Sequence, residues 1–259
     1  MGKIISIHSF RGGTGKSNLT ANLAAQFALA GKRVGVVDSD IQSPGIHVLF
    51  GLDEAKMGHT LNEFLRDECS IEDVAFNIGD NTLDAPGRNQ LEGKDMWLIP
   101  SSIKGSEISK IVRDSYDPNK LNEGLQNIQK DLNLDYLFID THPGLNEETL
   151  LSITISDLLV IILRPDQQDF QGTAVTVDIG RLLDVPQLYL VVNKALSKYD
   201  FGQMTEEISG VFASPVAGVL PLSEDLVDNA SADIFSLMQP EHGWSQGVQK
   251  ISQTLLGLE

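Results

Sequence analysis

The segment HSFRGGTGKSNLT, residues 8–20, says most about the fold of this 259-residue chain. A short apolar run precedes the segment, and apolar residues at helical spacing follow it. Because Gly12, Gly13 and Gly15 have no Cβ, consecutive backbone N–H groups can converge on phosphate oxygens at the start of a helix. The segment therefore predicts a strand, a phosphate-binding loop and a helix from about Lys16.

Two side chains of the loop have the chemistry that a bound nucleotide needs. Lys16 can reach the β- and γ-phosphates, and the Ser17 hydroxyl can coordinate Mg²⁺. Two others depart from the usual GxxxxGK[ST] pattern, since Phe10 stands where the first glycine is expected and the cation Arg11 lies beside it. A glycine-rich turn with a purely structural role is the alternative. The position of the loop between a strand and a helix favours nucleotide binding.

Short apolar runs alternate with segments of helical period along the chain. Such continuous runs are typical of buried parallel strands. They predict an α/β fold with a doubly wound, mainly parallel sheet and helices on both faces. A single domain over residues 1–259 is expected, because no linker or repeat interrupts the pattern. The expected strands are residues 3–8, 33–37, 96–99, 134–139, 157–163, 187–192 and 216–220.

The sequence also predicts the first helix and one long connection. The first helix is expected to bury Leu19, Leu23 and Phe27, and to end at Gly31, where a left-handed residue is wanted. Residues 79–94, GDNTLDAPGRNQLEGK, are polar and rich in turn-forming residues. They predict a long loop or a small excursion from the sheet.

Aspartates follow two of the expected strands. Asp38 and Asp40 end the run VGVVDSD, and Asp140 ends the run YLFID. The carboxyl ends of parallel strands meet at one edge of a sheet, where the phosphate loop lies and ligands bind. A carboxylate there can hold a Mg²⁺-bound water, and a second one can orient or deprotonate the attacking water. A helix or turn cap is the alternative role for each aspartate taken alone.

The chain is strongly acidic, with 19 Lys and Arg against 36 Asp and Glu and a formal net charge of −17. Residues 131–259 hold five basic and nineteen acidic side chains. Because binding to a phosphate polymer depends on cations, this charge disfavours non-specific DNA and anionic lipid as partners. The candidates for a local basic patch are Lys104, Lys110, Arg113 and Lys120, for which a solvated surface is the alternative.

Other features of composition exclude several classes of protein. Cys69 is the only cysteine, which excludes an internal disulfide and a cysteine-pair metal site within one chain. No segment approaches the roughly 20 apolar residues of a membrane helix, and residues 1–9 lack the pattern of a signal peptide. The final segment, ISQTLLGLE, has no cation after Lys250, so no direct membrane anchor is expected. We expect a cytoplasmic protein.

Three motifs, RGGTGKS, VVDSDIQSPG and FIDTHPG, occur in the order and at the separations of the deviant Walker A ATPases of the ParA/MinD family, which the chain resembles. The motifs VVNK at residues 191–194 and GVLP at residues 218–221 fall where that family recognises adenine. The resemblance covers nearly the whole chain and is weakest at residues 53–95 and after residue 230. It implies a P-loop NTPase fold of the SIMIBI type, ATP and Mg²⁺ as cofactors, and slow ATP hydrolysis without an activating partner.

The resemblance implies roles for the matching residues. The nucleotide-binding residues would be Gly12, Gly13, Thr14, Gly15, Lys16, Ser17 and Asn18, with Asn193 at the adenine edge and the backbone near Pro221 closing the pocket. Mg²⁺ and its shell would be held by Ser17, Asp38 and Asp140. Lys16 would neutralise phosphate charge in catalysis, and Asp40 would position the water. A strand-end cap is the alternative for Asn193.

Arg11 stands at the position of the family's signature lysine, which reaches across a dimer interface to the ATP of the other subunit. Arginine keeps the charge and adds a planar fork that can grip phosphate oxygens bidentately, so the resemblance implies a catalytic contact in trans. Capping of its own surface is the alternative. Phe10 resembles the ParA-type loops, which also lack the first glycine.

His142 follows Asp140 in the stretch that is expected to move with the γ-phosphate. A general-base histidine is one interpretation. Because phosphoryl transfer depends mainly on positioning and electrostatics, and the resemblance assigns no catalytic histidine here, we expect a packing role in the switch loop.

The resemblance implies a molecular switch that dimerises on ATP and positions, partitions or regulates a cargo. The expected partners are a second copy of the chain and an activating or cargo adaptor protein, whose basic segment would suit the acidic surface. A nucleotide-sensing scaffold with negligible hydrolysis and a metabolite-phosphorylating relative are the alternatives. Iron–sulfur carriers of the same superfamily use cysteine ligands, which the single Cys69 does not supply.

Overall fold

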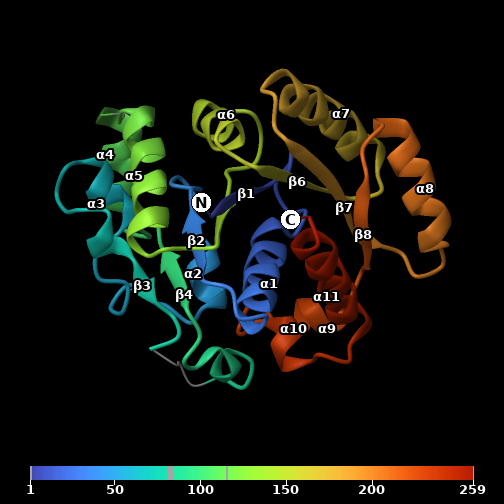
Figure 1. The fold of residues 1–259 in the computed structure, drawn as a ribbon, viewed down its shortest axis with the longest axis horizontal. Coiled ribbons are helices and arrows are strands. Elements are labelled where there is room, and N and C mark those ends of the chain that lie inside the picture. The colour runs from blue at the N-terminus through green and yellow to red at the C-terminus, as the bar shows by residue number, and fades with distance from the viewer. Residues whose placement is uncertain (1, 81–84, 115, 259) are drawn as a thin grey trace.

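The computed structural model describes residues 2–80, 85–114 and 116–258. Within these residues an eight-stranded sheet crosses the molecule (Figure 1). Its strands are β1 (Lys3–His8), β2 (Val34–Asp38), β3 (Phe76–Asn77), β4 (Met96–Ile99), β5 (Tyr136–Asp140), β6 (Leu158–Leu163), β7 (Gln187–Ala195) and β8 (Val216–Pro221).

The strand order is β3-β4-β2-β5-β1-β6-β7-β8, and every neighbouring pair is parallel except β3 with β4. Strand β1 lies inside the sheet, where Ile5 pairs with Phe138 of β5 on one side and with Leu158 of β6 on the other. Strands are added on both sides of β1, which is the doubly wound arrangement. The predicted fold class is confirmed.

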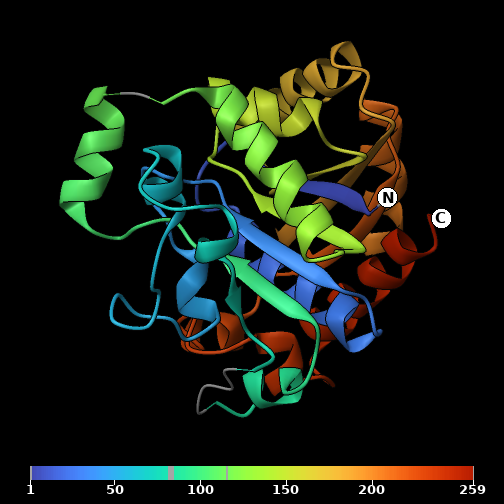
Figure 2. The same ribbon diagram turned by 60° about the vertical axis from the view of Figure 1, so that its left-hand side comes forward.

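Helices cover both faces of the sheet (Figures 1 and 2). The α-helices are α1 (Lys16–Leu29), α2 (Ile46–Leu49), α3 (Leu61–Leu65), α4 (Gly105–Asp114), α5 (Pro118–Asp131), α6 (Glu147–Thr154), α7 (Gln167–Leu182), α8 (Phe201–Phe212), α9 (Glu224–Asp228), α10 (Phe235–Met238) and α11 (Gly243–Leu256). Two short 3₁₀ helices are η1 (Glu72–Val74) and η2 (Arg88–Leu91).

The side chains of the central strands alternate between two faces, as the pleat requires. On β6, Leu158 and Val160 pack into a core cluster with α1, α10 and α11. The intervening Leu159 and Ile161 pack into another cluster with α6, α7 and α8. Because both faces are buried, β6 reads in the sequence as a continuous apolar run.

Each of the seven expected strands is present, with ends that differ by up to three residues. Leu134 lies outside β5 because its N–H donates to Gln129 O at the end of α5, at 2.9 Å. Strand β7 continues beyond its expected end to Ala195. The two-residue strand β3, antiparallel to β4 at the sheet edge, was not predicted because it is too short to show a period.

The first helix and the 79–94 excursion agree with expectation. Leu19, Leu23 and Phe27 of α1 are fully buried, and Gly31 follows the helix with φ 82°. The excursion folds back on itself, because the N–H of Gly93 donates to the carbonyl oxygen of Gly79 at 3.0 Å. It includes η2, whereas residues 81–84 of the predicted loop lie outside the described residues.

Helix α4 stands apart from the body of the fold, at the left of Figure 2. Ile111 is its one buried residue. The predicted basic patch lies just before α4, on α4 and on α5, and each of its residues has a carboxylate within 4.0 Å. The pairs are Lys104–Glu54, Lys110–Glu107, Arg113–Asp114 and Lys120–Asp67. These contacts compensate the four charges locally, which favours the solvated-surface interpretation.

Helix α11, the last helix of the fold, lies against β8 and α1. It buries the apolar side chains of Trp244, Val248 and Ile251 in the core. Of the helices in the described part of the chain, none has both the length and the hydropathy to cross a membrane.

Candidate functional site

Most of the predicted site residues gather at the carboxyl ends of β1, β2 and β5. The glycine loop follows β1, and Asp38 and Asp140 end β2 and β5 as direct neighbours in the sheet. A cleft of about 320 Å³ opens here, lined by Ser9, Gly12, Gly13, Thr14, Gly15, Lys16, Ser17, Asn18, Asp40, Ser43 and Pro143. The sheet thus brings the predicted phosphate loop and the predicted water-positioning carboxylate into one space.

Two carbonyl groups of the phosphate loop accept hydrogen bonds from side chains of β7. Asn193 Nδ2 donates to Thr14 O at 2.8 Å, and Lys194 Nζ donates to Gly13 O at 2.7 Å. In the part of the chain that the structure describes, no hydrogen-bond partner is found for the N–H groups of Gly13 and Gly15. The buried Thr14 hydroxyl is likewise without one. Donors without acceptors at the start of α1 form an arrangement that an anion completes.

Glycine is required in this loop for two reasons. Gly13 and Gly15 have left-handed backbones, with φ 77° and 95°. A Cβ on Gly15 would also lie 2.5 Å from Asn193 Nδ2. Asn193, which donates a hydrogen bond to the loop, can therefore approach this closely only when the position is glycine.

Lys16 lies at the base of the cleft in a buried ion pair. Its Nζ donates to Asp140 Oδ1 at 2.7 Å, and Thr20 Oγ1 donates to the same oxygen at 3.2 Å. The side chains of Lys16 and Asp140 are 8% and 1% exposed, so neither charge is compensated by water. A phosphate that enters the cleft would compete with Asp140 for the ammonium group.

Asp38 is fully buried beneath the cleft. Its Oδ2 accepts from Gly45 N–H at 3.0 Å, and its Oδ1 accepts from Asp40 N–H at 3.2 Å. Burial first, and then the neighbouring Asp140 carboxylate, raise the pKa of Asp38 well above its ordinary value, while the Lys16 charge acts in the opposite direction. A cation bound here would relieve the repulsion between the two carboxylates.

The donors at this edge fit Mg²⁺. Ser17, Asp38 and Asp140 offer hydroxyl and carboxylate oxygens, which are the hard ligands that this ion prefers. Among the described residues, no three His, Cys, Asp or Glu side chains form a metal cage of their own. Mg²⁺ usually keeps several waters in its shell and needs only one or two carboxylates from the protein, which the residues at this edge can offer.

Asp40 is tied to the loop that follows β5. Its Oδ1 forms a hydrogen bond with His142 Nδ1 at 2.7 Å and accepts from the Ser43 N–H and hydroxyl at 3.0 and 2.9 Å. The contact with His142 could not be predicted from the sequence, because it joins residues 102 positions apart. His142 therefore contacts the carboxylate that the family resemblance implies would position water.

Arg11 is directed at the N-terminal turn of α7. Its Nη1 lies 3.5 Å from Asp169 Oδ1 and 3.9 Å from Asp166 Oδ1. Asp169 is buried and also accepts from the Arg164 N–H at 2.9 Å and from the Arg164 guanidinium at 3.0 Å. The Arg11 side chain is 40% exposed, so within one chain it pairs from the surface with the exposed Asp166 and the buried Asp169.

Phe10 packs on α7 at Gly172, where a Cβ would overlap the ring. The residue that replaces the first glycine of the usual loop therefore anchors the loop on a helix. Sequence reasoning missed both Gly172 and Asp169 of α7. An isolated glycine within a helical pattern is a local sign of such a close approach, but it does not identify the partner.

The two residues predicted to recognise adenine lie in different surroundings. Asn193 is buried beneath the loop, where its amide donates to Thr14 O and its Oδ1 accepts from Trp244 Nε1 at 3.3 Å. Pro221 ends β8 and, with Tyr199, lines a separate cavity of about 580 Å³. Pro221 is therefore the one predicted site residue at the sheet edge of β8, away from the loop cleft.

Known proteins resemble this chain in sequence. A family model described as an AAA domain matches residues 2–189. An uncharacterized ATP-binding protein of Methanocaldococcus jannaschii is 28% identical over 255 residues, which cover 98% of this chain and 87% of that protein. The sporulation initiation inhibitor protein Soj of Bacillus subtilis is 32% identical over 184 residues, which cover 71% of this chain and 66% of Soj.

Two further similarities concern a carrier protein and a solved structure. An iron–sulfur cluster carrier protein of Methanococcus maripaludis is 29% identical over 196 residues, which cover 73% of this chain and 59% of the carrier. The cell division ATPase MinD of Pyrococcus furiosus superimposes with a TM-score of 0.83 at 21% identity, and the match covers 100% of both chains. This last likeness extends the agreement in fold over the whole sheet.

Proposed function

The chain belongs to the ParA/MinD family of P-loop ATPases, whose AAA-domain model it matches over most of its length, and from this we propose that it is an ATP-dependent molecular switch. It binds ATP with Mg²⁺, pairs with a second copy, hydrolyses ATP slowly, and so positions, partitions or regulates a cargo through a partner protein. Residues 1–259 form a single ATPase domain in this proposal. The observation that carries the proposal is the loop of unpartnered N–H donors at the head of α1, in one cleft with Lys16 and Asp40.

The loop is the proposed binding site of the triphosphate. The N–H groups of Gly13 and Gly15 hydrogen-bond phosphate oxygens, and no hydrogen bond among the described residues has to be broken for this. Lys16 exchanges Asp140 for the β- and γ-phosphates. Because the ammonium group is already buried at the base of the cleft, little of its hydration has to be removed when the nucleotide binds.

The aspartates divide the remaining chemistry between them. Ser17, Asp38 and Asp140 hold Mg²⁺, which when bound neutralises charge on the phosphate oxygens. Asp40 orients the attacking water. His142 fixes the orientation of Asp40 through the hydrogen bond at 2.7 Å, so the loops after β2 and β5 act together.

Arg11 changes partner between the monomer and the dimer. In one chain its half-exposed guanidinium lies beside Asp166 and Asp169. In the dimer it leaves these carboxylates for a phosphate of the ATP bound to the other copy, where its planar fork stabilises negative charge. The pair with Asp166 is exposed on both sides and contributes about 1 kcal/mol or less, and the buried Asp169 keeps its contacts with Arg164 when Arg11 leaves. The nucleotide can therefore compete for Arg11.

Light scattering on the Asp40→Ala protein tests this function. Since loss of hydrolysis traps an ATP-dependent dimer, we expect the mass of a dimer with Mg-ATP and the mass of a monomer with Mg-ADP. Adding Arg11→Ala to the same protein should restore the monomer mass in Mg-ATP. A monomer in both nucleotides contradicts the proposed switch, and a dimer that persists without Arg11 contradicts its role in trans.

Phosphate release separates the switch from its two alternatives. The wild-type chain should release phosphate slowly from Mg-ATP when no partner protein is present. Release should be faster when the partner is added. ATP binding with no release under either condition would favour a nucleotide-sensing scaffold. Transfer of phosphate to an added metabolite would favour a metabolite-phosphorylating relative.

The chemistry of the surface supports a basic protein as the partner. The net charge of −17 favours a basic segment over DNA or an anionic membrane, and we propose a cytoplasmic location. An iron–sulfur carrier role has little support from Cys69, because burial and then the Glu63 carboxylate raise the pKa of this thiol to about 11. The thiolate that a cluster needs is therefore disfavoured.

Replacing His142 with asparagine should change ATP turnover by less than about tenfold, because the asparagine amide can keep the hydrogen bond to Asp40. His142→Ala removes that bond and should lower turnover further while ATP affinity is retained. A general base would instead lose about a hundredfold or more in both variants. Steady-state phosphate release and the binding of a fluorescent ATP analogue measure the two quantities.

A further inference from the structure

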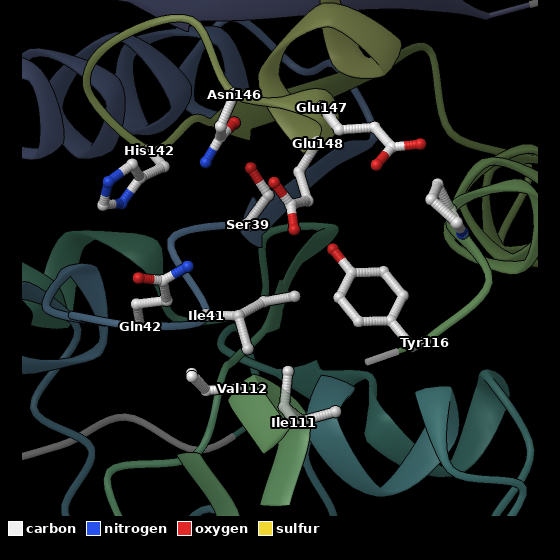
Figure 3. A pocket seen from close by; sticks show the side chains of 11 residues that line it. Ser39, Ile41, Gln42, Ile111, Val112, Tyr116, His142, Asn146, Glu147 and Glu148 are labelled. Atoms are coloured by element: carbon white, nitrogen blue, oxygen red, sulfur yellow. The ribbon is translucent and has the colours of Figure 1, made fainter. Parts of the chain in front are cut away.

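A second cavity lies beside the loops that carry Asp40 and His142 (Figure 3). Its volume is about 180 Å³, which suits one long side chain and not a nucleotide. Its walls are the loop after β2, the C-terminal part of α4 with the start of α5, and the segment that leads from β5 into α6. The cavity is separate from the phosphate-loop cleft, and neither the proposed function nor its alternatives use it.

The cavity combines an apolar side with a carboxylate side. Ile41 and Ile111 are buried residues that form the apolar side. Glu147 and Glu148, from the first turn of α6, stand opposite them, and Figure 3 shows Glu148 and Tyr116 directed toward one another across the space. None of the residues that line the cavity is Lys or Arg. Among the described residues that line the cavity, this negative charge therefore has no matching cation.

Tyr116 meets this charge with a neutral phenol and not with a cation. Its hydroxyl is buried and has no hydrogen-bond partner of standard geometry within the described residues. Burial, and then the carboxylates of Glu148 and Glu147, raise the pKa of this phenol, so it stays neutral. A neutral phenol beside a carboxylate leaves a site that still attracts a cation.

We propose that this cavity receives an arginine side chain of a partner protein. The proposal rests on the switch function given above, for which it supplies the site of the basic partner. The aliphatic stem of the arginine packs on Ile41 and Ile111, and the guanidinium reaches Glu148 and the hydroxyl of Tyr116. A chain with a net charge of −17 attracts basic segments, so charge complementarity selects this partner over an acidic one.

The position of the cavity links it to the nucleotide site. Ser39 and Ile41 flank Asp40 in the sequence and line the cavity, as does His142, which contacts Asp40. The N–H and hydroxyl of Ser39 both donate to Asp140 O at 3.0 Å, so the loops after β2 and β5 are joined behind the cavity. An arginine bound in this cavity contacts both loops. It therefore shifts the equilibrium between loop conformations toward the conformation that it binds more tightly.

A pair of peptides tests the proposal. One is a short alanine peptide with a central arginine, and the other has citrulline, a neutral isostere, at the same place. Calorimetry on the full chain should detect binding of the arginine peptide and none of the citrulline peptide. Glu148→Gln should weaken the arginine peptide about tenfold, since it removes the charge that the guanidinium meets. Glu206→Gln on α8, outside the cavity, is the matched control and should leave the affinity unchanged.

Tyr116→Phe adds a second variant, which keeps the ring and removes the hydroxyl. It should weaken the arginine peptide severalfold in a protein whose melting temperature is unchanged. Equal binding of the two peptides would overturn the proposal, and so would an unchanged affinity in the Glu148→Gln protein. A lysine peptide that binds as tightly as the arginine peptide would overturn the assignment of a guanidinium.

Nucleotide binding is measured in the same samples with a fluorescent ATP analogue. If ATP binds and the arginine peptide does not, the arginine site is overturned and the proposed function stands. If ATP does not bind, the proposed function itself is contradicted, whatever the peptide does. Phosphate release should also change when the arginine peptide is added to the wild-type chain and not to the Glu148→Gln protein; binding without that change would overturn the link to the nucleotide site.

Discussion

Replacing Asp40 with alanine should leave ATP affinity within about twofold of wild type and lower turnover by about a hundredfold or more. Asp40 lines the cleft beside the phosphate loop, whereas the loop donors and Lys16 supply the phosphate contacts in the proposed complex. The substitution therefore spares binding and removes the group that orients the attacking water. Binding of a fluorescent ATP analogue and steady-state phosphate release measure these two effects separately.

Asp53→Ala is the matched control for this prediction. Asp53 Oδ1 accepts from the N–H groups of Ala55 and Lys56 at 3.0 and 3.1 Å, so it caps a turn, as Asp40 does at Ser43. If loss of a turn cap caused the effect, both variants would lose turnover. Normal turnover in the Asp40→Ala protein would remove Asp40 from the mechanism.

Gly15→Ala should weaken ATP binding by about a hundredfold, which corresponds to about 2.7 kcal/mol. An alanine at φ 95° is strained by roughly 1–2 kcal/mol. The added methyl group would also lie 2.5 Å from Asn193 Nδ2, so Asn193 would have to release Thr14 O. The loop would then lose both its backbone geometry and the side chain that holds it. Calorimetry gives the affinity, and thermal unfolding gives the accompanying loss of stability.

Gly31 provides the control for the backbone strain. It has φ 82°, and no atom lies within 4 Å of the position of an added Cβ. Gly31→Ala should therefore lower stability by about 1 kcal/mol and leave ATP affinity unchanged. Equal losses of affinity in the two variants would mean that general destabilisation causes the effect. Wild-type affinity in the Gly15→Ala protein would contradict the role assigned to the loop.

The loop, the main strands and the strand-end aspartates could be predicted because each depends on residues close together in the sequence. The apolar run of β5 ends in Asp140, and parallel strands place their carboxyl ends at one edge, so the position of this carboxylate follows without knowledge of tertiary contacts. The same holds for Gly31, whose left-handed backbone ends α1.

The contacts of Arg11, His142 and Asn193 could not be predicted in the same way. Their hydrogen bonds join residues 158, 102 and 179 positions apart, and periodicity contains no information on which loops meet at such distances. For Asn193 the family resemblance implies an adenine contact, and the structure adds a hydrogen bond from its amide to the backbone of the loop beside it. Strand β3 escaped prediction for a different reason, since its pairing with β4 covers only two residues.

The hydrogen bond between Trp244 and Asn193 has a practical consequence. The indole of Trp244 is fully buried, and it is joined through Asn193 to the carbonyl of Thr14 in the phosphate loop. The chain has one other tryptophan, Trp97 on β4, whose ring lies 5.1 Å from the Arg33 guanidinium. A Trp97→Phe protein would therefore carry a single tryptophan, whose emission, excited at wavelengths that the four tyrosines do not absorb, reports the state of the loop without a chemical label.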